Sequence, residues 1–144
     1  IAETGYSLEP ISSAEEMKEI ISEEALAEQI LSKDYAYIEK RYFRHPVYHY
    51  DIWKIVDDKG SSHSVLITRD EVMGDRRVCE IIDHYGRRED LGRIAPALDR
   101  LMEIEGYEFV DVYSFGISIG MLLEFLWRFM SREDLCDVTH LAGI

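Results

Sequence analysis

The chain contains few cysteines and few prolines, fewer basic than acidic residues, and no long hydrophobic run. Its 144 residues include two cysteines, Cys79 and Cys136, and three prolines. Two cysteines are too few for a disulfide framework or a cysteine-rich metal cluster, so we expect Cys79, within an apolar run, to be an inert buried thiol. Such cysteine usage fits a reducing cytoplasm. The lack of long polar or Pro/Gly-rich tracts excludes extended disorder.

The shortage of positive charge excludes two classes of partner. There are 29 acidic against 16 basic residues, for a formal net charge of −13. Nucleic acids and anionic membranes bind surfaces rich in Lys and Arg, so we expect neither, although a local basic pocket for an anionic ligand stays open. No apolar run reaches the roughly 20 residues that cross a bilayer. The chain shows no signal-peptide pattern and opens at Ile1 rather than Met, which is compatible with a piece of a longer protein.

The first half of the chain predicts two helices followed by three strands. Residues 1–12 form a short opening segment, after which Ser12 or Ser13 caps a helix that runs to residue 31, with a glutamate three residues on. A second helix spans residues 34–43 and stops before Pro46. The strands that follow cover residues 47–56, 64–69 (extending as far as 72) and 77–85. Short turns join them, so they form an antiparallel meander.

The second half predicts alternating strands and helices, namely strand 78–86, helix 91–105, strand 109–114 and helix 117–132. Two strands joined by one helix are parallel, and ligands of such sheets bind beyond the carboxyl ends of the strands. The residues at these two ends are Asp83, His84, Tyr85 and Gly86, and Tyr113, Ser114 and Gly116.

This order of elements resembles the Gcn5-related N-acetyltransferase superfamily. The local motifs that carry the resemblance are KDY at 33–35, RYFRHPVY at 41–48, IIDHYG at 81–86 and VDVYSFGI at 110–117. They are most similar to a variant acyltransferase-like group, often one half of a longer two-domain chain. The resemblance implies an α+β (α/β) fold with a mixed sheet, an antiparallel meander followed by a parallel β-α-β unit, in a single domain over residues 1–144. Its parts are N-terminal helices (1–46), the meander (47–85), a helix–strand–helix unit (86–132) and a tail (133–144).

The tail is shorter than the resemblance requires. A complete member continues with two more strands after the last helix, and residues 130–141 leave room for one short strand at most. An incomplete sheet leaves an open edge and exposed apolar surface. We therefore expect a homodimer or packing against a second domain.

The resemblance also implies a site for acetyl-CoA or another acyl-CoA. The pantetheine arm would lie between the two parallel strands, and helix-start N–H groups would hold the pyrophosphate. The residues assigned to this site are Tyr85, Gly86, Arg87, Arg88, Gly92 and Ser114. The family's loop has glycines where this chain has none between Arg88 and Leu91. Glu89 and Asp90 place two carboxylates where two phosphate charges would lie.

Three residues are candidates for acid–base chemistry on an amine acceptor. His84 or Asp83 would act as the base or orient the acceptor. Strand alternation offers the alternative that His84 is an ordinary polar residue on one face. Tyr113 lies where the superfamily often has a tyrosine that protonates the departing thiolate, or it is simply a strand aromatic. Ser114 would assist by hydrogen bonding or would cap the next helix.

A basic aromatic patch precedes the first strand of the meander. Arg41, Arg44 and His45 would hold an acidic acceptor, or the arginines pair with the acidic first helix while Tyr42 and Phe43 enter the core. The histidines have no spacing that suits a metal site.

Three functions are compatible with these residues. The first is an acyltransferase that moves an acyl group from acyl-CoA to a small amine. The second is a degenerate, non-catalytic copy of the fold that serves as a structural or dimerisation module, favoured by the altered loop and the short tail. The third is a sensor that binds a small ligand without turnover.

Overall fold

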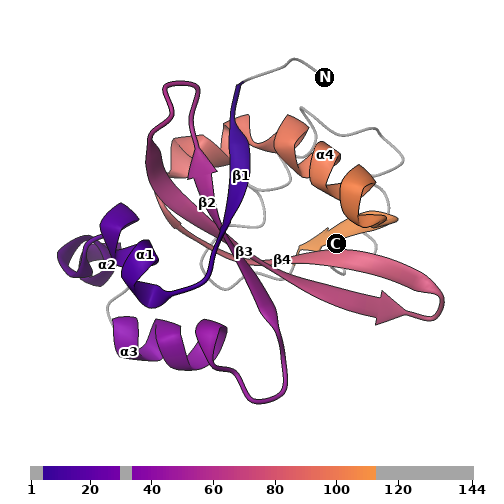
Figure 1. Cartoon of the computed structure of the whole chain (residues 1–144), viewed down its shortest axis with the longest axis horizontal. Helices are drawn as coiled ribbons and strands as arrows, with labels where there is room; N and C mark the ends of the chain where they lie inside the picture. The colour runs from indigo at the N-terminus through magenta and orange to yellow at the C-terminus, as the bar shows by residue number, and fades with distance from the viewer. Residues whose placement is uncertain (1–4, 30–33, 113–144) are drawn as a thin grey trace.

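A single mixed sheet organises the part of the chain that the structure describes. The structure is a computed structural model that describes residues 5–29 and 34–112 (Figure 1). The strands, in spatial and chain order, are β1 (Ser7–Ile11), β2 (Tyr50–Val56), β3 (Ser62–Met73), β4 (Arg76–Gly86) and β5 (Phe109–Val112). Neighbours are antiparallel from β1 to β4, and β4 pairs parallel with β5. The predicted meander and parallel pair are confirmed, whereas Tyr113, Ser114, Gly116, the helix over 117–132 and the tail lie outside the described residues.

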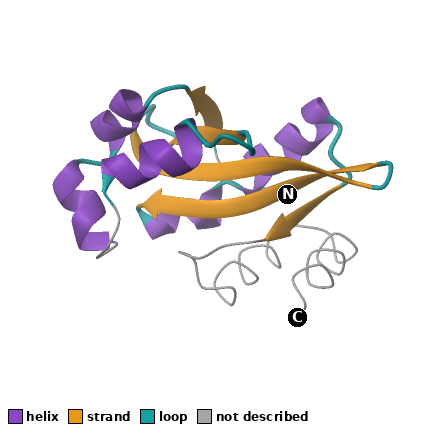
Figure 2. Ribbon diagram, turned by 90° about the horizontal axis from the view of Figure 1, so that it is seen from below, coloured by secondary structure: helices purple, strands orange, loops and turns teal. Residues whose placement is uncertain are grey.

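The helices lie in two groups. The first contains α1 (Ala14–Ile20), α2 (Glu23–Gln29), α3 (Tyr35–Ile38) and a π-helical turn that continues α3, η1 (Glu39–Phe43). The second contains a 3₁₀ segment, η2 (Arg88–Arg93), and α4 (Ala95–Glu105). Figure 1 shows the first group together in indigo and violet, away from α4 in orange. The β3–β4 hairpin projects as a long ribbon beyond the helices (Figure 2).

Each face of the sheet has its own core, because strand side chains alternate and helices cover both faces. The core under α4 contains Ile55, Leu66, Ile81, Ile94 and Leu98, with Cys79 beside them. Burial raises the pKa of the Cys79 thiol to about 12, which agrees with an inert thiol. The core under α1–α3 contains Met17, Leu26, Ile38, Tyr42, Ile67 and Tyr85.

The opening segment forms a strand, which the sequence analysis did not predict. β1 pairs with β2 in antiparallel register, with Pro10 opposite Trp53. The sequence analysis missed this strand because proline has no N–H and usually argues against a strand. Proline is tolerated at the edge of a sheet, which is where β1 lies. The strand is therefore stabilised by its hydrogen bonds to β2, which is distant in the sequence, rather than by its own strand propensity.

The first predicted helix is two helices. Ser13 caps α1 as expected, since its hydroxyl accepts the Glu16 N–H at 3.3 Å. The backbone then becomes extended at Ile21, and Ser22 accepts the Ala25 N–H at 3.1 Å to begin α2. The Tyr35 hydroxyl donates to the Ile21 carbonyl, so the break is held from the third helix.

Two other predicted boundaries move for local reasons. The α-helix predicted from Leu91 begins at Ala95, because Pro96 fits the first turn of a helix and would break its interior. The strand predicted from Val47 begins at Tyr50. The Nδ1 atom of His45 accepts the N–H groups of Val47 and Tyr48, at 3.1 and 3.0 Å, and bends that segment away from the sheet.

Candidate functional site

A cavity of about 400 Å³ lies at the carboxyl end of β4. Its apolar wall comes from the α1–α2 pair, through Ile20, Ile21 and Ala25, and its polar wall contains Glu28, Gln29, His63, Gly86 and Arg87. The Gln29 amide bridges the two sides. Its Nε2 donates to the Gly86 carbonyl at 3.0 Å, and its Oε1 accepts the Gly86 N–H at 2.8 Å. Because both groups of Gln29 are used, α2 is fixed against the end of the strand.

Gly86 is required by this packing. Its φ is +105°, and a Cβ on it would lie 2.3 Å from the His63 carbonyl oxygen. The next residue completes the contact, since the Arg87 N–H donates to the same carbonyl at 3.2 Å. The predicted end of β4 at Gly86 therefore depends on the close approach of its backbone to that of β3.

Asp83 and His84 are neighbours on β4 and so lie on opposite faces of the sheet, and a β-bulge sets which face each of them takes. Ile67 pairs with Asp83 while Thr68 pairs with Ile81, which leaves Ile82 as the extra residue. Bulges of this kind re-aim side chains and often lie near functional sites. The predicted cluster of Asp83, His84 and Tyr85 is thus divided, with Asp83 and Tyr85 facing α3 and His84 facing the η2 side.

Asp83 is the acceptor in a buried network of tyrosines. Its Oδ2 accepts the hydroxyls of Tyr85 at 2.8 Å and Tyr42 at 3.1 Å, and its Oδ1 accepts the His84 N–H at 2.9 Å. Burial, with the Asp83 charge nearby, raises the pKa of Tyr42 to about 12 and also raises the pKa of Tyr85. Both hydroxyls therefore stay protonated as donors, and Asp83 holds the two rings in place.

His84 is buried, with 4% of its surface exposed. Its Nε2 is the one buried side-chain nitrogen or oxygen in the described part of the chain that has no hydrogen-bond partner. Burial lowers the pKa of His84 to about 4, with Asp90 opposing this shift and Arg88 adding to it. At neutral pH the ring is unprotonated, as a general base must be.

This burial predicts a pH dependence. The folded pKa lies below the usual value of 6.5, so the stabilising contribution is present above pH 6.5 and is lost as the pH falls toward 4. Relative to His84→Leu, wild type should lose about 3 kcal/mol of unfolding free energy between pH 7 and pH 4. Urea denaturation of both proteins across this range measures it. A pH-independent difference between them would contradict the burial of the ring.

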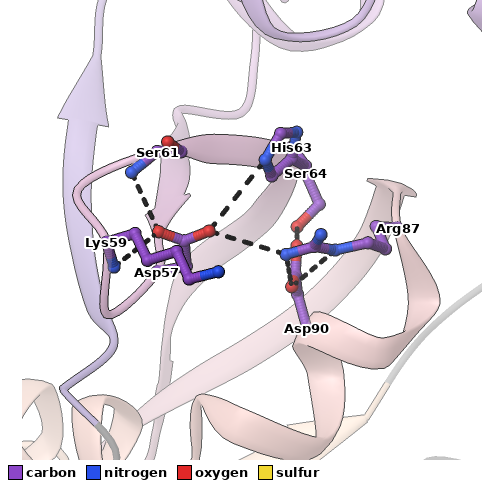
Figure 3. A network of polar contacts seen from close by, with 7 residues as sticks. All are labelled: Asp57, Lys59, Ser61, His63, Ser64, Arg87 and Asp90. Carbon is purple, nitrogen blue, oxygen red and sulfur yellow. Dashed lines mark hydrogen bonds and ion pairs between the residues drawn. The ribbon is translucent and has the colours of Figure 1, made fainter.

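A network of charges joins the β2–β3 turn to the loop after β4 (Figure 3). Asp57 Oδ1 accepts the N–H groups of Lys59 and Ser61, each at 2.9 Å, and these bonds lower the pKa of Asp57. Its Oδ2 lies 3.7 Å from Arg87 and 3.9 Å from the His63 ring. The turn predicted at 57–60 is confirmed and holds one wall of the cavity.

Asp90 is a buried clamp on this loop. Its Oδ1 receives Nε and a terminal nitrogen of Arg87 at 3.1 and 2.9 Å, and its Oδ2 accepts the Ser64 hydroxyl at 2.7 Å (Figure 3). Only 2% of Asp90 is exposed. The sequence analysis placed the carboxylates of Glu89 and Asp90 where a diphosphate would lie. The Asp90 carboxylate instead points into the protein, whereas Glu89 is exposed.

The structure brings together only part of the predicted site. Gly86 and Arg87 line the cavity, and Tyr85 is fully buried beneath the strand end. Arg88 is exposed and makes no ion pair within residues 5–29 and 34–112. The sequence analysis did not assign Gln29 and Asp57 to this site. Both lie far in the sequence from the loop after β4, and no local motif indicates that they contact it.

The basic patch before β2 is partly as predicted. Tyr42 is in the core, with 3% of its surface exposed. Arg44, however, pairs with Glu39 of its own helix at 2.9 Å rather than with the acidic first helix. Among the described residues, no helix is long and apolar enough to cross a membrane, and no His, Cys, Asp and Glu side chains gather as a metal site.

The chain has the same fold as several solved structures that are named acetyltransferases. The chain superposes on an aminoglycoside acetyltransferase from an uncultured soil metagenomic sample, in complex with sisomicin, with a TM-score of 0.56, 10% identity and 88% coverage of both chains. It also superposes on the ribosomal-protein-alanine N-acetyltransferase of Brucella melitensis biovar Abortus 2308, with a TM-score of 0.54, 11% identity, and coverage of 81% of this chain and 85% of that chain. No protein family and no curated protein sequence matches the chain. The predicted acetyltransferase-like fold is confirmed.

Proposed function

We propose that this chain is an acyltransferase domain that transfers an acyl group from acyl-CoA to a small amine. The observation that carries the proposal is the polar cavity at the carboxyl end of β4, because ligands of such sheets bind beyond the strand ends. The fold agrees, since the two solved structures described above are named acetyltransferases.

The loop after β4 supplies groups for the diphosphate of acyl-CoA. Arg88 is exposed and makes no ion pair in the described part of the chain, so its guanidinium is available to phosphate oxygens. Gly86 and Arg87 lie at the cavity, and the inward-facing Asp90 no longer opposes an anion there. Gly92 and Ser114 remain predicted members of this site.

The acid–base groups follow from the divided cluster. Both oxygens of Asp83 already accept hydrogen bonds, so we assign it the role of a positioning residue for Tyr42 and Tyr85. His84 stays a candidate base because its Nε2 has no partner among the described residues, but it faces the η2 side and does not line the cavity, and burial lowers its pKa to about 4. The acid that protonates the thiolate stays assigned to Tyr113. In this reaction the C–N bond forms as the thioester C–S bond breaks, and the acceptor nitrogen loses two protons on going from ammonium to amide. One proton is returned to the thiolate by the acid, and the other leaves through the base to solvent.

A specific observation favours the second candidate, a non-catalytic structural module. The Arg87 guanidinium is already held by Asp90 and lies near Asp57, and Glu89 adds a negative charge to the exposed side of the loop. A loop in this arrangement can stabilise the fold without binding a diphosphate.

Calorimetric titration with acetyl-CoA separates the two candidates. We expect micromolar binding to the wild-type chain and its loss in Arg88→Glu, because the variant reverses the unpaired charge. Arg76→Glu is a control with the same charge change at the opposite end of β4, although it also breaks the ion pair of Arg76 with Glu108, so its folding is checked by circular dichroism. Absence of heat at millimolar acetyl-CoA would overturn the acyltransferase proposal and leave the structural module. Equal binding by wild type and Arg88→Glu would overturn the assignment of the loop.

A further inference from the structure

A second cavity, of about 320 Å³, lies at α3, η1 and the segment after them, and is lined by Tyr37, Lys40, Arg41, His45 and Pro46. None of these lining residues is acidic, in a chain of formal net charge −13. The proposed acyltransferase site does not use this cavity. A cavity of this size falls at the lower end of the range for small-molecule sites.

The two cations on this cavity have no carboxylate partner in the described part of the chain. Lys40 is exposed and makes no ion pair or hydrogen bond with residues 5–29 or 34–112. The Arg41 guanidinium lies over the Tyr42 ring, 5.2 Å from its centre, which holds the side chain without neutralising it. The nearest acid of the same helix, Glu39, is already paired with Arg44.

The loop after η1 adds a third hydrogen-bond donor, the Nε2–H group of His45. The Nδ1 atom of His45 accepts two backbone N–H groups, so the proton of the neutral ring is on Nε2. The ring also packs 5.2 Å from Tyr48 and 5.8 Å from Tyr50, centre to centre. The donor is therefore preorganised before any ligand arrives.

We propose that this cavity binds a small phosphate monoester. Its charged groups, an ammonium and a guanidinium, are donors only, and with His45 they offer more N–H groups than a carboxylate has acceptor sites. A phosphate dianion presents three acceptor oxygens and up to two charges, which matches such a set. Tyr37 and Pro46 supply apolar walls for the organic part of the ligand. The cations also lie in the last turn of the helix, where positive charge is favourable, so the test must separate binding from helix stability.

Phenyl phosphate is the probe, followed by ¹H–¹⁵N NMR on the full chain. We expect shifts confined to residues 35–48 and a dissociation constant in the millimolar range or tighter, weakened by salt. Arg41→Gln and Lys40→Gln should each weaken binding roughly tenfold, as expected for loss of a charge-assisted hydrogen bond. Lys59→Gln, an exposed lysine in the β2–β3 turn, is the matched control and should bind as wild type does. Near-ultraviolet circular dichroism confirms that each variant is folded.

Two further ligands test which part of phenyl phosphate the cavity recognises. Phenol, which lacks the charge, should not bind, and benzoate should bind more weakly than phenyl phosphate. No shift at millimolar phenyl phosphate, or equal affinity in Arg41→Gln, would overturn the site. Benzoate binding as tightly as phenyl phosphate would overturn the phosphate assignment. Acetyl-CoA itself carries a phosphate monoester on its ribose, so the independent readout is acetyl-dephospho-CoA, which lacks that group. Its binding should be unchanged in Arg41→Gln, so failure here and failure of the acyltransferase proposal are distinguishable.

Discussion

Gly86→Ala should lower the unfolding free energy by about 4 kcal/mol, a large part of the 5–15 kcal/mol that holds a domain of this size folded. Two costs add. The φ of +105° is a conformation that alanine rarely adopts, and its Cβ would lie 2.3 Å from the His63 carbonyl oxygen and 2.7 Å from the Ser64 Cα. Both clashing atoms are backbone, so relief requires β3 and β4 to separate. Chemical denaturation followed by circular dichroism measures the loss.

Gly74→Ala is the matched control for this effect. Gly74 also has a positive φ, +68°, but nothing lies within 4 Å of a Cβ built on it. We expect a loss of about 1 kcal/mol, from the conformation alone. If the two variants lost the same amount, the close approach of the strands at Gly86 would be refuted.

Asp83→Ala should also cost about 4 kcal/mol of unfolding free energy. The change leaves two tyrosine hydroxyls and one backbone N–H without their acceptor inside the core, and each unsatisfied buried group costs about 1–3 kcal/mol. Part of this is recovered, since the Tyr42 and Tyr85 hydroxyls are 3.4 Å apart and can bond to each other. Urea unfolding at neutral pH is the measurement.

Asp83→Asn separates the hydrogen bonds from the charge. Asparagine keeps the shape and one acceptor oxygen, so we expect about half of the loss seen for alanine. An alanine variant within 1 kcal/mol of wild type would show that the network contributes little, by the ordinary scale of surface substitutions. Acyl transfer in the asparagine variant, measured as turnover, would report the positioning role of Asp83 separately from stability.

The strands of the meander could be predicted because each is a dense apolar run bounded by turn residues. The 57–60 turn and the Ser13 cap follow from short-range chemistry, and both are found. β1 could not be predicted, since Glu9 and Pro10 disguise it and its partner lies more than forty residues away. The break at Ile21 depends on Ser22 and on the hydroxyl of Tyr35, and the sequence marks only the serine.

The sequence predicts where the candidate site lies but not how its side chains are arranged. The end of β4 follows from topology, and Gly86 and Arg87 are found there. The bulge at Ile82 could not be foreseen, because it depends on the register between two strands, and it decides that Asp83 rather than His84 faces α3. Asp90 could not be assigned either. Its local sequence is that of an exposed helix start, and its partner Ser64 lies on β3, distant in the sequence.

Pro10 also bears on how copies of this chain can associate. β1 occupies one end of the sheet, so its outer side would be the natural template for a strand from a neighbouring molecule. A strand added there would find no amide hydrogen at Pro10, and the charged side chain of Glu9 lies beside it. The missing donor at Pro10 therefore disfavours addition of a strand at this edge, while the Glu9 carboxylate is held by Lys54 at 3.3 Å.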